Sequence, residues 1–150
     1  KFKDKNLYES LSAYGVGFHR HVSEIDQELK FITKKKVNFI FTPHLTPMFR
    51  GILSTIYVES KNKKSIHDFY RELINFYRGK KFIIIKKIDS MISTNNVINT
   101  NNIQISVCKT KFKNKFIILS AIDNLIKGGA GQAVQNMNIK YDFKINEGLK

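Results

Sequence analysis

The chain has 150 residues, of which 26 are Lys or Arg and 12 are Asp or Glu, so its formal net charge is +14. Hydrophobic residues make up 42%, which suits one domain with a core of its own and excludes wholesale disorder. The single cysteine, Cys108, excludes an intramolecular disulfide framework and a multi-cysteine zinc site. No apolar run approaches the roughly 18 residues of a membrane-spanning helix, and no signal peptide opens the chain. We therefore expect a soluble, cytoplasmic domain.

The first half of the chain predicts short strands around one helix. Residues 13–18 (AYGVGF) are expected to form a short strand or turn. Ser23 is a candidate N-cap for a helix that runs to about Thr33. The alternating run 37–42 (VNFIFT) and the β-branched run 50–59 (RGILSTIYVE) both predict strands.

The second half predicts further strands between two helices. Ser65, with Asp68 three residues later, is expected to cap a helix that ends at Gly79, because its apolar residues recur at helical spacing. The Asn- and Thr-rich stretch 94–102 predicts a loop. Three predicted strands and a last predicted helix lie at 82–88, 103–108, 116–122 and 125–139. Together these elements predict an α+β domain over residues 1–150, with a mixed, mostly antiparallel sheet and helices packed on one face.

The make-up of the positive charge bears on the choice of partner. A strongly basic chain suggests nucleic acid, but 22 of the basic residues are Lys and only four are Arg. The chain also holds 21 Ile, 14 Asn and four Ala, a bias typical of codons in an adenine- and thymine-rich genome. Arg is the residue expected for bidentate contacts with bases and phosphates. We therefore expect solvated lysines, and keep a stand-alone basic nucleic-acid-binding module as the alternative.

Two of the four histidines lie in a polar cluster, His19-Arg20-His21, with Glu24 one helical turn further on. Imidazole titrates near neutral pH and can transfer protons, and a nearby carboxylate can orient its ring. The guanidinium of Arg20 can bind a carboxylate or a phosphate. Because the two histidines flank a positive charge, we expect no metal site here. A solvated polar turn before a helix would produce the same pattern.

Two further segments carry residues that suit a site. Both prolines of the chain lie in residues 42–51, which also hold His44 and Arg50; such a stiff connection can present side chains or merely join two strands. Residues 123–138 place three glycines in a helical pattern, at a cost of about 1 kcal/mol each against Ala. That cost suggests close packing, or a ligand near backbone N–H groups at a helix start. Cys108 is expected to be structural.

Three blocks of the chain together resemble the N-acetyl-gamma-glutamyl-phosphate reductase family and occur in the same order as in that family. They are AYGVGFHRHVSEIDQEL (13–29), FTPHLTPMFRGIL (41–53) and SAIDNLIKGGAGQAVQNMN (120–138), with a fainter match at 94–107. The resemblance implies an α+β catalytic and oligomerisation domain like that of glyceraldehyde-3-phosphate and aspartate-semialdehyde dehydrogenases. A Rossmann domain that binds NADP and the catalytic cysteine motif are then expected upstream of Lys1.

The reaction implied by the resemblance is a step of arginine biosynthesis. N-acetyl-L-glutamyl 5-phosphate is reduced by NADPH to N-acetyl-L-glutamate 5-semialdehyde, with release of phosphate. In the family a cysteine thiolate attacks the acyl phosphate and NADPH delivers a hydride to the thioester, so the 150 residues alone are expected to be inactive. The implied partners are this small acyl-phosphate substrate and further copies of the chain, in a dimer or tetramer. Neither nucleic acid nor a membrane is expected as a partner.

The resemblance also implies roles for single residues. These are acid/base catalysis by His19 or His21, substrate binding by Arg20, Glu24 and Arg50, and cofactor contacts by Asn124, Lys127 and Gly128, with no metal ligand. Two departures from the family are Asn99, where Gly is usual, and Ile103, where many members carry Cys. Cys108 lies outside the family's nucleophile motif and is not expected to replace it.

Overall fold

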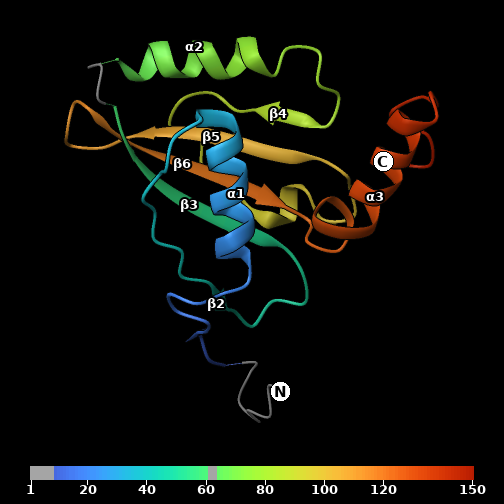
Figure 1. Cartoon of the computed structure of the whole chain (residues 1–150), viewed down its shortest axis with the longest axis horizontal. Coiled ribbons are helices and arrows are strands. Elements are labelled where there is room, and N and C mark those ends of the chain that lie inside the picture. The colour runs from blue at the N-terminus through green and yellow to red at the C-terminus, as the bar shows by residue number, and fades with distance from the viewer. Residues whose placement is uncertain (1–8, 61–63) are drawn as a thin grey trace. The chain divides into compact units, whose positions relative to one another are not determined.

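The computed structural model describes residues 9–60 and 64–150 (Figure 1). The chain divides into two units, residues 1–49 and residues 50–150. Most of the lysine-rich run 61–64 falls outside the described residues. No helix of the described part is long and apolar enough to cross a membrane.

Unit 1 contains one helix and a two-stranded antiparallel sheet. Strand β1 (Ser12–Ala13) pairs with β2 (His44–Leu45). The run 13–18, predicted as a short strand or turn, is mostly a turn: β1 ends at Ala13 and the chain turns at Gly15 and Gly17, whose φ angles are +56° and +77°. The prediction of a strand at 37–42 is wrong, since no described strand pairs with this run. Alternating apolar residues indicate a segment with one apolar and one polar face, but such a segment becomes a strand only when a neighbouring strand forms hydrogen bonds with it.

Helix α1 (His21–Thr33) begins earlier than predicted. The prediction of Ser23 as its N-cap is wrong: Arg20 occupies the cap position in a helical conformation, and the Ser23 hydroxyl donates to the Arg20 carbonyl oxygen at 2.9 Å. The first N–H groups bond to His19 instead. Its carbonyl oxygen accepts from the Val22 N–H at 2.9 Å and its ring Nδ1 accepts from the His21 N–H at 3.2 Å.

Unit 2 is built on a four-stranded sheet in the order β3-β6-β5-β4 (Figure 1). The strands are β3 (Ile52–Glu59), β4 (Ile83–Ile85), β5 (Ile103–Lys109) and β6 (Lys115–Ile122). Only β4 and β5 run parallel, so the prediction of a mixed, mostly antiparallel sheet is confirmed. β4 is shorter than the predicted strand at 82–88.

Helix α2 (Ile66–Phe76) packs on one face of this sheet. It ends before Gly79, which adopts a φ of +74°. Its apolar side chains Ile66, Phe69 and Leu73 lie in one cluster with residues of three strands, among them Val107 and Phe116. The apolar stripe read from the sequence is therefore the face that builds the core.

The opposite face of the sheet is covered in part by the Asn- and Thr-rich segment, which contains the short 3₁₀ helix η1 (Thr94–Asn96). Ile92, just before this segment, and Val97 within it pack against Leu119 and Ala121 of β6. Asn99 has a φ of +63°, a conformation that Gly adopts freely and Asn tolerates. The resemblance implies Gly at this position, and this φ suits either residue.

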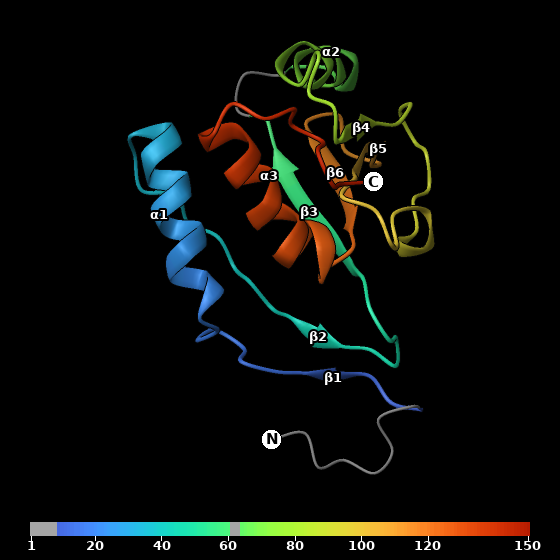
Figure 2. The same ribbon diagram turned by 90° about the vertical axis from the view of Figure 1, so that its right-hand side faces the viewer.

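The prediction of a single helix at 125–139 is wrong. A π-helical turn, η2 (Ile126–Ala130), precedes helix α3 (Gly131–Lys140), and Gly129 breaks the helical path with φ −150° and ψ −113°. A Cβ atom at Gly131 would lie only 2.5 Å from Asn101 Oδ1, so the glycine allows a close approach that a regular helix would not need. Figure 1 shows α3 beyond the end of β6, and in Figure 2 the helix α2 is seen end-on.

The start of α2 offers a test of the local assignment. Ser65 Oγ accepts from the Asp68 N–H at 3.2 Å and Asp68 Oδ2 accepts from the Ser65 N–H at 3.1 Å, a reciprocal capping box. We expect Ser65→Ala to lower the free energy of unfolding by about 1 kcal/mol, measured by urea denaturation. Ser23→Ala is the matched control in α1. Because Ser23 caps no N–H group, this substitution should change the free energy of unfolding by only a few tenths of the effect of Ser65→Ala. Equal losses in both variants would contradict this account of the two helix starts.

Candidate functional site

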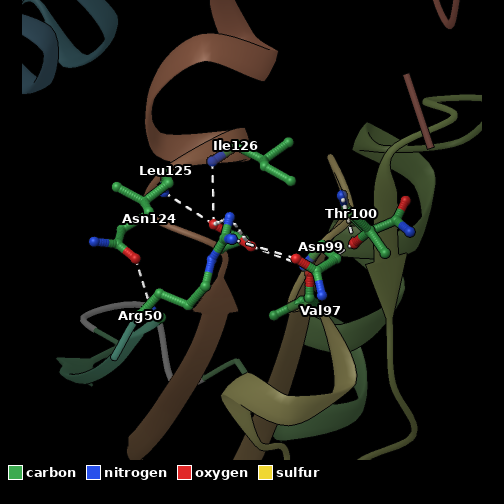
Figure 3. Close-up of polar contacts among 10 residues, drawn as sticks. Arg50, Val97, Asn99, Thr100, Asn124, Leu125 and Ile126 are labelled. Carbon is green, nitrogen blue, oxygen red and sulfur yellow. Dashed lines mark hydrogen bonds and ion pairs between the residues drawn. The ribbon is translucent and has the colours of Figure 1, made fainter. Parts of the chain in front are cut away.

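A buried ion pair lies where β6 ends and β3 begins (Figure 3). Arg50 Nη2 donates to Asp123 Oδ1 at 2.8 Å and lies 2.7 Å from Asp123 Oδ2, and Nη1 donates to Asn99 Oδ1 at 3.3 Å. The side chain of Asp123 is 0% exposed and that of Arg50 is 18% exposed. At this burial the pair is shielded from solvent and the Coulomb attraction is strong.

Asp123 also accepts hydrogen bonds from three backbone N–H groups. They belong to Asn99 at 2.8 Å, Leu125 at 2.9 Å and Ile126 at 3.1 Å (Figure 3). Burial by itself raises the pKa of this carboxyl, but the bonds from Arg50 and the three N–H groups outweigh it and lower the pKa from 3.8 to about 2. Asp123 is therefore ionised at neutral pH and ties three chain segments together.

The neighbouring residue, Asn124, is oriented by the same junction. Its Oδ1 accepts from the Gly51 N–H at 2.6 Å. This bond decides which end of the amide points inward, so the Asn124 NH₂ group points away and forms no hydrogen bond with the described residues. Gly51 has a φ of +113°, and a Cβ there would lie 2.8 Å from the Thr94 Cβ, so only glycine fits beside Asn124.

Lys127 and Gly128 have partners within unit 2. Lys127 Nζ donates to Gln135 Oε1 at 2.9 Å and lies 5.5 Å from the centre of the Phe82 ring. Burial lowers the pKa of the Lys127 ammonium. The Gly128 N–H donates to the Asp123 carbonyl oxygen at 3.0 Å, so this N–H is engaged by the chain itself.

The histidine cluster lies in unit 1. The His19 ring lies between aromatic rings, with centroids 5.3 Å from Tyr14, 4.6 Å from His21 and 5.5 Å from Phe41. Because His19 Nδ1 accepts from the His21 N–H, the proton of the neutral ring belongs on Nε2. The contacts thus assign both the orientation and the tautomer of His19.

The other predicted residues of unit 1 are more exposed. His21 Nε2 lies 3.9 Å from Glu24 Oε2, with 45% and 69% of the two side chains exposed. Arg20 forms no ion pair with the described residues and lines an open hollow together with His19, Ser23 and Lys36. An unpaired guanidinium beside an oriented imidazole suits a small anionic ligand.

The eight predicted site residues therefore fall into two groups. The histidine group lies in unit 1, and the Arg50 group, with Asn124, Lys127 and Gly128, lies in unit 2. Asp123, Asn99 and Gly51, which hold the second group, were missed by the sequence interpretation. A signal existed for Asp123, since Asp-Asn directly follows an apolar strand. Cys108 is buried and free, and the described residues contain no group that could hold a metal ion.

A family model described as "Semialdehyde dehydrogenase, dimerisation domain" matches residues 1–124. The chain belongs to this family. Two solved structures of aspartate semialdehyde dehydrogenase II from Vibrio cholerae share its fold, with TM-scores of 0.64 and 0.60 at 15% and 16% identity. Each of these matches covers 85% of this chain and 38% of the solved chain. The second structure is a complex with ASA. The predicted fold class is thereby confirmed.

Curated relatives narrow the similarity further. The chain is 45% identical over 148 residues to the N-acetyl-gamma-glutamyl-phosphate reductase of Clostridium botulinum, and 42% identical over 144 residues to that of Staphylococcus aureus strain MRSA252. These alignments cover 99% and 96% of this chain and 42% of each relative. The chain thus spans about two fifths of the length of the curated relatives it matches, and the resemblance drawn from its three blocks is confirmed.

The low pKa of Asp123 predicts how stability depends on pH. A carboxyl with a pKa of about 2 in the folded chain and 3.8 when unfolded contributes about 2 kcal/mol above pH 4; the contribution falls as the pH drops toward 2 and vanishes below that. Asp123→Asn should remove this acid-dependent part and also lower stability at pH 7 by about 3 kcal/mol, because Arg50 loses its counterion. Urea denaturation at a series of pH values measures both effects.

A surface ion pair provides the control for this prediction. Lys64 Nζ lies 2.6 Å from Glu72 Oε1, but both side chains are about half exposed. Glu72→Gln should therefore change stability at pH 7 by at most about 1 kcal/mol. An Asp123→Asn protein that loses stability in acid in parallel with the wild type would show that Asp123 is not the responsible group.

Proposed function

We propose that this chain supplies the acid/base and substrate-binding part of an NADPH-dependent N-acetyl-gamma-glutamyl-phosphate reductase. The observation that carries this proposal is the identity of 42–45% with enzymes of that name, which extends over nearly the whole chain. The reaction would reduce N-acetyl-L-glutamyl 5-phosphate to the 5-semialdehyde and release phosphate. The comparisons give no support to the alternative of a nucleic-acid-binding module.

His19 is the better candidate for the acid/base group. Its Nδ1 is occupied by the His21 N–H, so its Nε2 can donate a proton to an oxygen that becomes negatively charged in the reaction. The surrounding rings of Tyr14 and Phe41 limit its rotation. A group held in one orientation loses less freedom when the reacting atoms come together.

His21 and Glu24 would support this group, while Arg20 would bind the substrate. Glu24, 3.9 Å from His21, can orient that imidazole. Arg20 has no ion-pair partner among the described residues, and its guanidinium matches either a phosphate or a carboxylate, both of which the proposed substrate carries. Arg50 is already paired with Asp123 and would act by holding the Asp123–Asn124 turn.

One observation supports a contact between this junction and NADP. The NH₂ group of Asn124 is turned outward by the Gly51 bond and can donate to a carboxamide oxygen of the nicotinamide. Lys127 keeps its ammonium close to Gln135, at the edge of the same junction. When bound, NADPH supplies the hydride of the reaction.

The proposal extends to assembly and location. The matching family is described as a dimerisation domain, so we infer that the protein forms a homo-oligomer with a dimer as its basic unit. A cytoplasmic location agrees with a biosynthetic role.

Substitution of each histidine tests the proposal. In the protein that carries this chain, or in a fusion with the part of the C. botulinum relative that this chain does not match, His19→Ala should lower kcat about 10²- to 10⁴-fold, as expected for a lost acid/base group. NADPH oxidation with the acyl phosphate measures turnover. His67→Ala, at an exposed position of α2, is the control and should leave it unchanged. Wild-type turnover in both His19→Ala and His21→Ala would refute the assigned role.

A further inference from the structure

The Lys127 ammonium is held in unit 2 by two groups that carry no negative charge. Its Nζ donates to Gln135 Oε1 at 2.9 Å and lies 5.5 Å from the centre of the Phe82 ring. Phe82 is only 4% exposed, and a ring face at this distance attracts a cation without neutralising it. Among the described residues Lys127 has no carboxylate as an ion-pair partner, so its charge is uncompensated.

Other lysines of unit 2 that bond to a side chain have a partner of a different kind. Their ammonium groups lie 2.6 to 3.8 Å from carboxylate oxygens, in the pairs Lys64–Glu72, Lys109–Asp89 and Lys115–Glu59. These three lysines are exposed, whereas Lys127 is half-buried and burial lowers the pKa of its ammonium. The least solvated of the four lysines is therefore the one without a counterion, although a poorly solvated charge benefits most from one.

The donors around Gln135 determine how its amide is oriented. A lysine ammonium only donates hydrogen bonds, so the oxygen of Gln135, and not its NH₂ group, faces Lys127. The same oxygen accepts from Asn101 Nδ2 at 2.8 Å. An amide oxygen has two lone pairs, and both are used here. Gln135 thus joins the half-buried ammonium to Asn101 through a single oxygen atom.

Asn101 is a rigid anchor for this amide. It is 0% exposed, and its backbone N–H donates to the Lys150 carbonyl oxygen at 2.6 Å. Its Oδ1 lies so close to Gly131 that a Cβ atom there would be only 2.5 Å away. The place of Gln135 Oε1, and with it that of Lys127 Nζ, therefore depends on buried contacts and not on the flexible lysine side chain alone.

The ammonium lies at the end of the sheet that also carries Asn124. β6 ends at Ile122, where β3 and β5 begin, and β4 begins beside the first residue of β5. Phe82 directly precedes β4, while Asn124 and Lys127 directly follow β6. A lysine ammonium has three N–H donors, and Gln135 takes one of them. The other donors can therefore reach a ligand that also meets the outward-pointing Asn124 amide.

We propose that Gln135 is a positioning residue that holds the uncompensated Lys127 ammonium in place for a phosphate group of a bound ligand. The inference rests on the proposed function, in which both NADPH and the acyl-phosphate substrate carry phosphate, and it adds Gln135 to the site. A glutamate at this position could make the same hydrogen bonds but would neutralise the lysine. The neutral amide orients the ammonium without weakening its attraction for a negatively charged phosphate.

Gln135→Glu separates the positioning of Lys127 from its charge, in the protein or fusion used for the histidine variants. The carboxylate can still accept from Lys127 and Asn101, so stability in urea should not fall, but the new ion pair removes the free charge. If the phosphate belongs to the cofactor, the Kd of NADPH, measured by calorimetric titration, should rise about 10-fold or more. The KM for NADPH should rise with it, and kcat should change much less. If the phosphate belongs to the substrate, the KM for the acyl phosphate should rise instead.

Gln132→Glu is the matched control on the same helix. The Gln132 Nε2 donates to Asn136 Oδ1 at 2.8 Å, so this variant changes the net charge by the same amount without placing a carboxylate on Lys127. It should bind both ligands as the wild type does. Lys127→Met removes the ammonium itself and should reproduce the loss of affinity seen in Gln135→Glu.

The outcomes separate this inference from the proposed function. A Gln135→Glu protein with wild-type affinity for both ligands would overturn the inference. So would equal losses of affinity in Gln132→Glu and Gln135→Glu, or a loss that appears only together with a loss of stability. None of these results bears on the histidine variants, whose readout is turnover. Conversely, wild-type turnover in both histidine variants would leave the NADPH titration of Gln135→Glu unaffected.

Discussion

The junction in unit 2 depends on the buried carboxylate of Asp123. Four hydrogen bonds reach this one group, one from the Arg50 guanidinium and three from backbone N–H groups, and the guanidinium also forms an ion pair with its second oxygen. The donors come from three separate segments of the chain: Arg50 before β3, Asn99 after η1, and Leu125 and Ile126 after β6. Removing a buried carboxylate from water is unfavourable, and these donors offset that cost only if all of the segments stay in place. Each of these segments therefore depends on the others to stay in place around the buried charge.

This cooperativity reaches Asn124, the residue through which the junction can meet a ligand. Arg50 bonds to the side chain of Asp123, and the next residue, Gly51, bonds through its backbone to the side chain of Asn124. The consecutive residues Arg50 and Gly51 thus bind the consecutive residues Asp123 and Asn124. The Asn124 amide is consequently presented as a hydrogen-bond donor before any ligand arrives, and a preorganised donor costs less to bind. In unit 1 the contacts of His19 likewise orient its ring, so that its Nε2 is held in one direction.

The net charge of +14 comes from 22 lysines and only four arginines. Of the two candidate arginines, Arg20 is the cation that suits a ligand, because Arg50 is neutralised by Asp123.

The sequence by itself determined the family, the order of the long strands, the helix capped by Ser65 and the histidine cluster, because these depend on local motifs and on regular apolar spacing. It failed at 37–42, at the start of α1 and in the last helix. There the outcome depends on a pairing partner, on the ring of His19 and on the close approach of Asn101 to Gly131. The partners of Asp123 could not be assigned from the sequence, since Arg50 and Asn99 lie 73 and 24 residues away. Only the tertiary structure brings such distant groups within hydrogen-bonding distance, and only that proximity lowers the pKa of the carboxyl and orients Asn124.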